Sequence, residues 1–254
     1  MRYVRFEKSG ASRFGILEGE NISSLAGAPW IGHELSGETF HLGQVRLLAP
    51  VQPGNIFCVG LNYKDHAKEV GSELPEEPSI FLKGINSLLE PGGMIRIPDW
   101  AGRVDYEGEL AVVIGKACRN VSEKDVPAMI FGMACLNDIT ARELQRKDSI
   151  LIRSKSFDTF CPIGPWIVDA ADANGRSIVT RLNGRAVQSA NTDMMIFSVP
   201  KLVSYISRFA TLQPGDVIAT GTPAGIGSLK AGDQVEVEIE GLGLLKNTCV
   251  ADHS

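Results

Sequence analysis

The chain has 254 residues, of which 44% are hydrophobic, so at roughly 100–200 residues per domain it forms one large domain or one domain with a small attachment. Its formal net charge of −5 argues against nucleic acid or an anionic membrane surface as a partner. No apolar run approaches the about 20 residues that cross a bilayer, and the first segment, MRYVRFEKSG, lacks the apolar core of a signal peptide. The five cysteines form no CxxC pair, which predicts buried, reduced thiols and a cytoplasmic protein.

Residues 1–48 have the pattern of short strands and turns. RYVRF alternates between apolar and polar side chains, and FGILEGENISSL predicts a hairpin around Glu18-Gly19-Glu20. The proline- and glycine-marked stretch from Pro50 to Gly54 indicates a boundary. We therefore expect a small N-terminal β module over residues 1–50 and a larger unit over residues 51–254.

The larger unit carries mostly strand signals and few helix signals. Asn183-Gly184 lies between two alternating runs and predicts a tight hairpin. One helix is expected over 126–134, after Ser122 and Asp125 in an arrangement close to a capping box. A second is expected after Ser198, with Pro200 in its first turn and an apolar face made by Leu202, Val203, Ile206 and Phe209. Without regular βαβ alternation, the pattern predicts a mixed, β-rich α+β fold.

The stretch VDYEGELAVVIG, residues 104–115, opens with two carboxylates and continues as an unbroken apolar run. Glu107 and Glu109 are two residues apart, so in a strand they point to the same side. Alternating glutamates usually mark a solvated face, and QVEVEIEG (234–241) has that ordinary pattern. In 104–115 the alternation stops after Glu109, and buried carboxylates without partners are unfavourable. A divalent cation would satisfy both glutamates.

The stretch CLNDITARELQ, residues 135–145, is the best source of further polar groups for such a site, because a hard cation takes about six oxygen ligands. A helix starting there would place Asp138, Arg142 and Gln145 at i, i+4 and i+7, on one face. Arg142 has two interpretations. It is either an ordinary salt-bridge partner within the helix or a guanidinium whose planar fork binds a substrate carboxylate.

The stretch VGLNYKDHAKEV, residues 59–70, ends a strand at Gly60 and then predicts a helical turn. Within that turn His66 and Glu69 are three residues apart and therefore neighbours. A lone pair of this kind is most often a surface contact. A carboxylate beside an imidazole also orients a general base and raises its basicity, so a structural and a catalytic interpretation both stay open.

Two later stretches add a cation and a glycine-rich loop. RSKSFDTFCPIGPWIV (153–168) places Lys155 before an aromatic, proline-rich segment, where the stem of a lysine can also pack while its amine stays in solvent. IATGTPAGIG (218–227) lacks the GK[ST] of a P-loop. It is either a tight turn or a group of backbone N–H donors that, with Thr222, holds an anion.

Taken together, these stretches resemble the fumarylacetoacetate hydrolase family. The matching segments follow the family's order and cover most of residues 53–250. Each is weak alone, whereas seven in order are specific. They are FCVGLNYKDHAKE, PSIFLKG, DYEGELAVVIG, NDITARELQ, KSFDTFCPIGPW, NGRAVQSANT and GDVIATGTPAGIG. Residues 1–50 resemble the short variable β module that precedes this domain in some members.

The resemblance implies a mixed β-sandwich roll with a few flanking helices, usually in a homodimer. It implies Mg2+ or Mn2+ as cofactor, held by Glu107, Glu109 and Asp138. It also implies that His66 and Glu69 activate a water from a mobile lid helix, with Lys155 polarising the substrate. The further substrate contacts that it implies are Arg142, Gln145, Thr222, Tyr63 and Lys83.

One departure from the family pattern bears on the substrate. The hydrolase that gives the family its name has a fourth metal-ligating carboxylate just before its histidine segment. Here the stretch reads Leu61-Asn62-Tyr63, with a shorter spacing to His66. We expect a water in that coordination position. The departure argues against fumarylacetoacetate itself and favours the branch that acts on smaller substrates.

The activity implied is hydrolysis of a C–C bond in an acylpyruvate, such as fumarylpyruvate or acetylpyruvate, with release of pyruvate through an enolate. The alternatives are decarboxylation of oxaloacetate or a related β-keto diacid, and isomerisation of a 2-hydroxyhepta-2,4-diene-1,7-dioate-type product of aromatic ring cleavage. A non-enzymatic binding protein with this fold would be expected to have lost at least one of Glu107, Glu109, Asp138 and Lys155. All four are present in this chain. The expected partner is a small oxo-carboxylic acid, with no nucleic acid or membrane.

Overall fold

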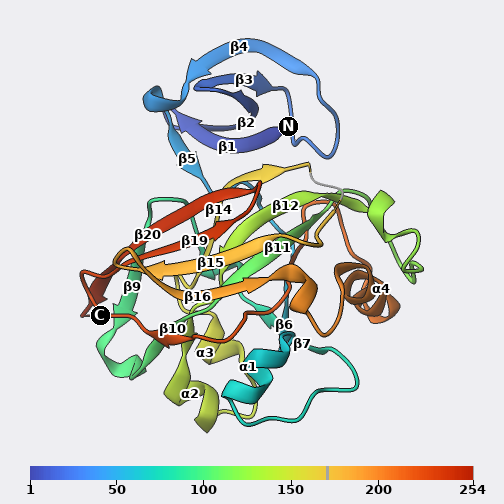
Figure 1. The fold of residues 1–254 in the computed structure, drawn as a ribbon. Coiled ribbons are helices and arrows are strands. Elements are labelled where there is room, and N and C mark those ends of the chain that lie inside the picture. Colours follow the sequence, from blue (N-terminus) through green and yellow to red (C-terminus); the bar gives the residue numbers. More distant parts are fainter. Residues whose placement is uncertain (170–171, 254) are drawn as a thin grey trace.

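The computed structural model describes residues 1–169 and 172–253. Within them, strands dominate and the few helices lie at the periphery, as expected for a β-rich α+β fold (Figure 1). No helix in the described part of the chain is both long and apolar enough to span a bilayer. All five cysteines are buried and form no disulfide.

A twelve-stranded sheet forms the centre of the molecule, with the main order β4-β3-β2-β1-β14-β12-β11-β17-β6-β7. Two short strands lie off this path, because β5 pairs with β1 and β8 pairs with β14. The strands are β1 (Arg2–Lys8), β2 (Ala11–Glu18), β3 (Asn21–Leu25), β4 (Leu35–His41), β5 (Arg46–Leu48), β6 (Ile56–Gly60), β7 (Ser79–Lys83), β8 (Leu88–Leu89), β11 (Gly108–Ile114), β12 (Ile130–Asn137), β14 (Cys161–Val168) and β17 (Val217–Ala219).

Two smaller sheets and several helices complete the fold. A five-stranded sheet has the order β16-β15-β19-β20-β9, and a three-stranded sheet has the order β13-β10-β18. Their strands are β9 (Met94–Pro98), β10 (Val104–Tyr106), β13 (Thr140–Ala141), β15 (Ser177–Leu182), β16 (Arg185–Asn191), β18 (Gly227–Ser228), β19 (Gln234–Ile239) and β20 (Gly243–Asp252). The helices are α1 (Lys64–Glu69), α2 (Arg142–Lys147), α3 (Ile152–Lys155) and α4 (Val199–Phe209), and the 3-10 turns are Leu42–Gln44, Ile85–Ser87, Asp99–Ala101, Val126–Ala128 and Thr192–Met194.

The apolar run of β11 is buried on both faces, which explains why its alternation stops after Glu109. Leu110, Val112 and Ile114 belong to the core shared with α4 and the five-stranded sheet. Ala111 and Val113 belong to a second core on the opposite face of the strand. A strand covered on both faces needs apolar residues at every position. Glu109 therefore begins a segment that has no solvated side.

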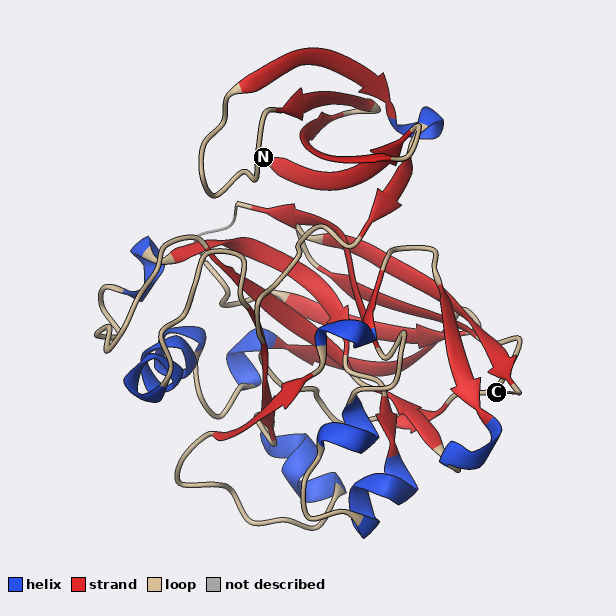
Figure 2. Cartoon of the chain, turned by 180° about the vertical axis from the view of Figure 1, so that it is seen from behind, coloured by secondary structure: helices blue, strands red, loops and turns tan. Residues whose placement is uncertain are grey.

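Helices α1, α2 and α3 gather at one end of the sheets, away from the N-terminal strands (Figures 1 and 2). Helix α4 covers a flank of the larger body. Its N-cap is Ser198, whose hydroxyl accepts a hydrogen bond from the backbone N–H of Lys201, and Pro200 lies in the first turn as predicted. The start of β11, where Glu107 and Glu109 lie, is at the same end of the molecule as α1, α2 and α3.

The N-terminal strands form an upper lobe with a small core of Val4, Phe6, Leu17 and Ile22 (Figure 1). The lobe nevertheless continues the central sheet, because β1 pairs antiparallel with β14. The predicted hairpin is confirmed, with Glu18 opposite Asn21 in the β2–β3 pair.

The hairpin predicted at Asn183-Gly184 is also confirmed, since these two residues join β15 and β16. Both have positive φ, of 52° and 79°, which is the backbone geometry that favours Asn-Gly in a two-residue hairpin. Along β19, Glu238 is exposed while Val235, Val237 and Ile239 are buried, so the half-exposed interpretation of 234–241 is correct.

The helix predicted over 126–134 is wrong. Only Val126–Ala128 is helical, as one 3-10 turn, and Ile130–Asn137 is the strand β12 between β11 and β14. The apolar run belongs to a strand buried on both faces, whose unbroken hydrophobicity resembles a buried helix in sequence. Gly132 fits this strand, because a Cβ there would lie 2.3 Å from the carbonyl oxygen of Val168.

Two other local expectations also need correction. Asp138 does not lie on a helix with Arg142 and Gln145, because β12 ends at Asn137 and α2 begins only at Arg142. Phe209 does not share the buried face of α4, since it ends the helix and is 57% exposed. Leu202, Val203 and Ile206 are buried as predicted.

Candidate active site

Three buried carboxylates converge at the junction between β10 and β11. Glu107 and Glu109 flank Gly108, and Asp138 follows β12, the neighbour of β11 in the sheet. One oxygen from each of the three lies within 4.8 Å of the others. The backbone holds this convergence, because Asp138 donates its N–H to the carbonyl of Glu107 at 2.8 Å.

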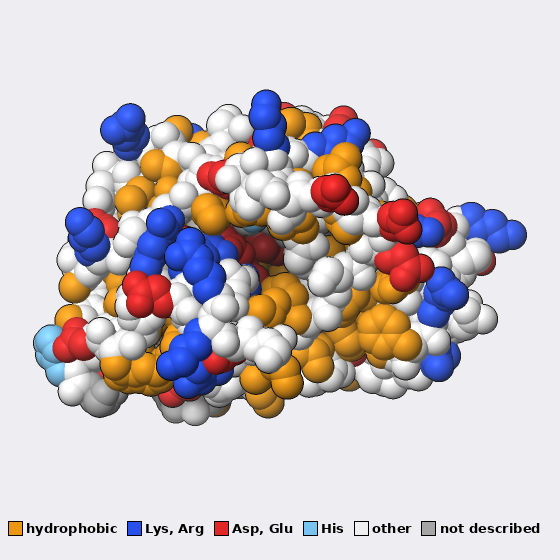
Figure 3. Space-filling model, turned by 90° about the horizontal axis from the view of Figure 1, so that it is seen from below, with side chains coloured by type: hydrophobic (Ala, Val, Ile, Leu, Met, Phe, Trp, Pro, Cys, Tyr) orange, Lys and Arg blue, Asp and Glu red, His pale blue; other side chains and the backbone are white. Residues whose placement is uncertain are grey.

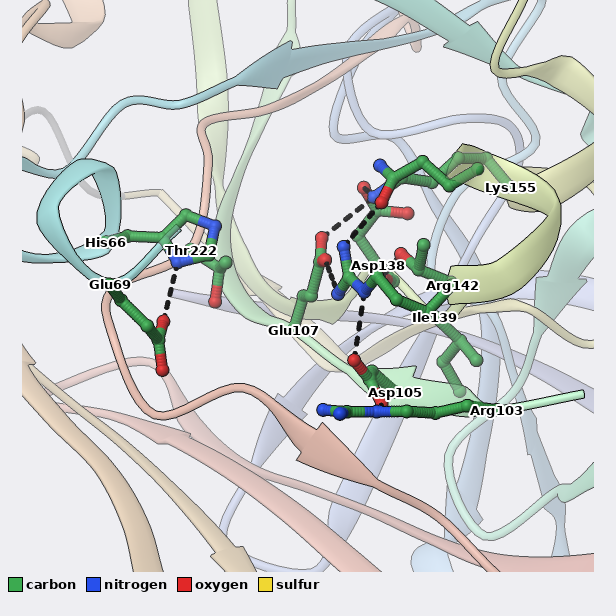
Figure 4. Close-up of polar contacts among 12 residues, drawn as sticks. His66, Glu69, Arg103, Asp105, Glu107, Asp138, Ile139, Arg142, Lys155 and Thr222 are labelled. Carbon is green, nitrogen blue, oxygen red and sulfur yellow. Dashed lines mark hydrogen bonds and ion pairs between the residues drawn. The ribbon is translucent and has the colours of Figure 1, made fainter. Parts of the chain in front are cut away.

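Three cations surround two of these carboxylates. Lys155 Nζ lies 2.8 Å from Glu107 Oε2 and 2.7 Å from Asp138 Oδ2. Arg142 Nη2 donates to Glu107 Oε1 at 2.5 Å (Figure 4). Lys83 Nζ donates to Asp138 Oδ1 at 2.7 Å. Although burial would raise the pKa of Glu107, the charges of Lys155 and Arg142 lower it to about 2. Glu107 is therefore held as a carboxylate.

Glu109 is the carboxylate without a cation partner of its own in the described part of the chain. It accepts a hydrogen bond of 2.8 Å from the backbone N–H of Gly221. Burial, followed by the like charges of Asp138 and Glu107, raises its pKa well above the ordinary value. A divalent cation between the three carboxylates would supply the missing positive charge and oxygen ligands of the kind that it prefers. The donor set therefore fits a hard divalent metal ion.

His66 and Glu69 form a contact on α1, as the helical spacing predicted. His66 Nδ1 lies 2.8 Å from Glu69 Oε2, and His66 is buried. The other oxygen of Glu69 accepts a hydrogen bond of 3.0 Å from the backbone N–H of Gly225. A donor at Nδ1 leaves the lone pair on Nε2, the arrangement that a general base needs.

Thr222 lies in a buried polar network beneath the glutamates. Its hydroxyl donates to the carbonyl of Gly108 at 3.0 Å and accepts from Gln188 Nε2 at 2.8 Å. Gln188 also accepts from the N–H of Gly108 at 3.0 Å and donates to the carbonyl of Pro223. The Gln188 amide thus binds both Gly108, which lies between the two glutamates, and the glycine-rich loop.

A cavity of about 200 Å³ joins these groups. Acidic side chains form its floor in the hollow seen from below, with apolar and basic side chains around its mouth (Figure 3). In the close-up, His66, Glu69 and Thr222 lie across the space from Lys155 and Arg142 (Figure 4). The lining residues are Val59, Gly60, Leu61, His66, Val70, Phe81, Glu107, Glu109, Asp138, Arg142, Gln145, Leu151, Lys155 and Thr222.

Lys83 and Tyr63 lie outside this lining. Lys83 approaches Asp138 and also donates to the carbonyl of Ile139 at 3.1 Å, so it supports the carboxylate cluster. Tyr63 is fully buried, and its hydroxyl has no hydrogen-bond partner among the described residues. Burial and the nearby charge of Glu109 raise the pKa of Tyr63 above its ordinary value.

Asn62, in the stretch that departs from the family pattern, binds the backbone of two distant segments through its side chain. Its side-chain amide donates to the carbonyls of Phe197 and Thr220 at 3.0 and 2.7 Å. Its carbonyl oxygen accepts the N–H of Phe197 at 2.7 Å. Both the NH2 group and the carbonyl oxygen of the side chain are therefore bonded, which fixes the chain just before α1.

Comparison with known proteins identifies the family of this chain. Residues 55–250 match the family model described as fumarylacetoacetate (FAA) hydrolase, C-terminal. The chain belongs to the fumarylacetoacetate hydrolase family. Residues 1–50 match a separate model, described as Rv2993c-like, N-terminal. Family members with named activities are enzymes, and this chain is an enzyme of the same family.

Three relatives show the range of activities in the family. The human mitochondrial oxaloacetate tautomerase FAHD2A is 42% identical over 220 residues, which cover 82% of this chain and 70% of that protein. The structure of 2-hydroxyhepta-2,4-diene-1,7-dioate isomerase from Mycobacterium marinum matches with a TM-score of 0.93 and 39% identity, covering 100% of both chains. The fumarylacetoacetate hydrolase from Exiguobacterium antarcticum matches with a TM-score of 0.88 and 35% identity, covering 99% of this chain and 100% of that one.

Several residues that shape the site gave no sequence signal of their own. Asp105 is buried and accepts from Arg142 Nε at 2.9 Å and from Arg103 Nε at 2.6 Å. Asn137 accepts the N–H of Glu107 at 2.9 Å. Gln188 lies in the expected hairpin, but its contacts with Gly108 and Thr222 cross between sheets. The alternation of polar and apolar residues along one strand does not show which residues of other strands form its hydrogen bonds.

Proposed function

We propose that the enzyme hydrolyses the C3–C4 bond of an acylpyruvate, a 2,4-dioxo acid, and releases pyruvate and a carboxylic acid. The observation that carries this proposal is that His66, which contacts Glu69, lines the same cavity as the three-carboxylate cluster. One side of the cavity thus offers a base for water, and the other offers a site for positive charge. Hydrolysis through an enolate requires both.

Glu107, Glu109 and Asp138 would hold Mg2+ or Mn2+, which we propose as the cofactor. The bound ion would supply Lewis-acid stabilisation of negative charge on the substrate oxygens. Lys155 would add its charge beside the developing enolate oxygen, since fixed charges in a water-poor cavity act strongly on the transition state. Arg142, Gln145 and Thr222 lie around the same space and would position the substrate carboxylate.

His66 would take a proton from water through Nε2 while Glu69 holds the imidazole by Nδ1. The resulting hydroxide attacks the distal carbonyl carbon, and a C–O bond forms there. The C3–C4 bond then breaks, with its electron pair passing into the enolate of pyruvate. Protonation of C3 by the imidazolium gives pyruvate, and the acyl part leaves as a carboxylate.

The test is an assay on metal-stripped protein with Mg2+ or Mn2+ added back. Pyruvate release is followed from acetylpyruvate, fumarylpyruvate and oxaloacetate in parallel. Metal-dependent pyruvate from the acylpyruvates supports the proposal. Pyruvate from oxaloacetate alone would replace it with decarboxylation of a β-keto diacid, and no pyruvate from any substrate would exclude both.

Oxaloacetate tautomerisation is the second candidate, because a relative named for that activity is 42% identical over 220 residues. The same His66 could move a proton between C3 and the enol oxygen without activating water. The named isomerase structure supports proton transfer of this general kind in the family. Loss of the enol absorbance of oxaloacetate, faster with enzyme and without pyruvate release, would identify this activity.

We also propose a homodimer, as the family resemblance implies. Analytical ultracentrifugation at two protein concentrations tests this assembly. A mass of one chain at both concentrations would contradict it.

A further inference from the structure

Two hollows of the molecule share a wall. The active cavity of about 200 Å³ lies on one side, and an apolar groove of about 750 Å³ lies on the other. Phe81 and Leu151 line both. The remaining groove residues are Phe57, Ser79, Ile80, Leu82, Ser149, Ile150, Ile152 and Phe209.

The wall between the two hollows is apolar, since Phe81 and Leu151 form it. Val59 and Val70 are further apolar residues in the lining of the active cavity, which also includes the three carboxylates, Arg142 and Lys155. Arg142 and Lys155, the lining cations, are each already engaged by two or more acceptors, namely carboxylates or the amide oxygen of Gln145. The apolar residues of the lining suit an uncharged group on the substrate.

The groove behind the wall is unusually apolar for a surface feature. Leu82, Ile150, Ile152 and Phe209 are 45%, 72%, 48% and 57% exposed, respectively. Contiguous exposed apolar surface of this kind commonly marks a binding groove. Its position directly behind Phe81 and Leu151 makes it continuous with the cavity once either side chain moves or is shortened.

We propose that Leu151 determines the length of the acyl group that the enzyme accepts, and that the substrate is an acylpyruvate with a short, uncharged alkyl group. This inference rests on the proposed function. Leu151 lines both the cavity and the groove, so the groove would take a longer alkyl chain if that side chain were removed. The class of ligand that fits both spaces is an unbranched apolar chain carried by a 2-oxo acid.

Leu151→Ala is the informative variant. The backbone of Leu151 supports α3, because its carbonyl accepts from the N–H of Lys155 at 3.1 Å and from the hydroxyl of Ser154 at 2.8 Å. Both bonds are backbone features of residue 151 that alanine keeps. Phe81 is left intact, since Lys155 Nζ lies 5.1 Å from the centre of its ring. Ile152→Ala is the matched control, because Ile152 lines the groove but not the active cavity.

The kinetic experiment compares kcat/KM for acetyl-, butanoyl- and hexanoylpyruvate in the wild-type enzyme and the two variants. We expect wild type and Ile152→Ala to lose activity as the chain lengthens. In Leu151→Ala, kcat/KM should instead rise about fourfold for each added methylene, the ratio that corresponds to ~0.8 kcal/mol per buried methylene. Parallel chain-length profiles in all three proteins would overturn the inference.

A binding experiment separates this inference from the proposed function. Calorimetry measures the affinity of the Mg2+-loaded proteins for pyruvate, 2-oxohexanoate and 2-oxooctanoate, none of which requires hydrolysis. Tighter binding of the longer acids by Leu151→Ala alone supports the inference even if no acylpyruvate is cleaved. If the affinity of Leu151→Ala does not depend on chain length, the inference is wrong. A lower mass of Ile150→Lys in ultracentrifugation would then identify the groove as an interface between two copies of the chain.

Discussion

The backbone N–H of Gly225 donates a hydrogen bond of 3.0 Å to Glu69, the residue that also contacts His66. Gly225 belongs to the glycine-rich loop that carries Thr222, whereas Glu69 ends the short helix α1. The carboxylate therefore joins α1 to the glycine-rich loop and orients the imidazole at the same time. If α1 moved away, His66 would lose its position and part of its orientation together.

Glu109→Gln should remove metal binding. The substitution keeps the size of the side chain but takes away the negative charge that completes the carboxylate cluster. We expect the affinity for Mn2+ to fall by more than the about 10–100-fold that is typical when a residue behind a metal ligand is changed. Calorimetric titration of metal-stripped protein measures this. Glu238→Gln, on the exposed side of β19, is the control, and equal Mn2+ affinity in both variants would refute the ligand assignment.

His66→Ala should separate water activation from enolate chemistry. Loss of a general base typically lowers the rate about 10²–10⁴-fold, so hydrolysis of acetylpyruvate should fall by that amount. Decarboxylation of oxaloacetate needs no attacking water and should be spared. Both rates are measured at saturating metal, with the exposed His41→Ala as control. An equal loss in both reactions would mean that His66 mainly orders α1 or binds substrate.

Gln188→Ala should weaken both the fold and the metal site. The variant leaves the N–H of Gly108 and the carbonyl of Pro223 without their buried partner. Because an unsatisfied buried polar group costs about 1–3 kcal/mol, the free energy of unfolding in urea should drop by at least that amount. The affinity for Mn2+ should drop about 10–100-fold, because Gly108 lies between two proposed ligands.

The matched control for that variant is Gln213→Ala, whose side chain is exposed. It should change neither quantity. Loss of stability in Gln188→Ala with an unaltered Mn2+ affinity would limit Gln188 to a structural role.

Removal of the metal should destabilise the wild-type protein. The three carboxylates repel one another, and the metal binds only the folded arrangement that brings them together. At a free metal concentration about 100 times Kd, binding adds ~2.7 kcal/mol to the free energy of unfolding. Thermal unfolding with Mg2+ and with excess chelator measures the difference. Glu109→Gln should show almost none, and an equal shift in that variant would assign the stabilisation to another site.

The local sequence predicted the parts of the site that depend on short spacings. The contact between His66 and Glu69 follows from one helical turn. Glu107 and Glu109 converge as their two-residue spacing predicts, although 104–115 is not one strand, because Glu107 lies between β10 and β11. Asp138 reaches the same cluster by a different route from the helix that was expected. The pairing of β11 with β12 brings it there, which the spacing of residues 138–145 does not show.

The parts that sequence reasoning missed depend on distant pairing. Lys83 is expected only as a substrate contact, and its bond to Asp138 joins residues 55 apart. Gln188 lies 80 residues from Gly108. The strand at 130–137 looked helical for a related reason. Its two faces are covered by elements remote in sequence, so the alternation that identifies an exposed strand is absent. Local sequence patterns identify the residues that act in the site better than they identify the distant residues that hold them in place.

The pairing of β1 with β14 covers an edge of the central sheet. Strand β14 contacts β12 on one side, and β1 occupies its other side through Tyr3 opposite Ile167. Without residues 1–50, that side would present free backbone donors and acceptors, which readily recruit a strand from another molecule. We therefore expect a chain that begins at residue 51 to aggregate more readily than the full chain.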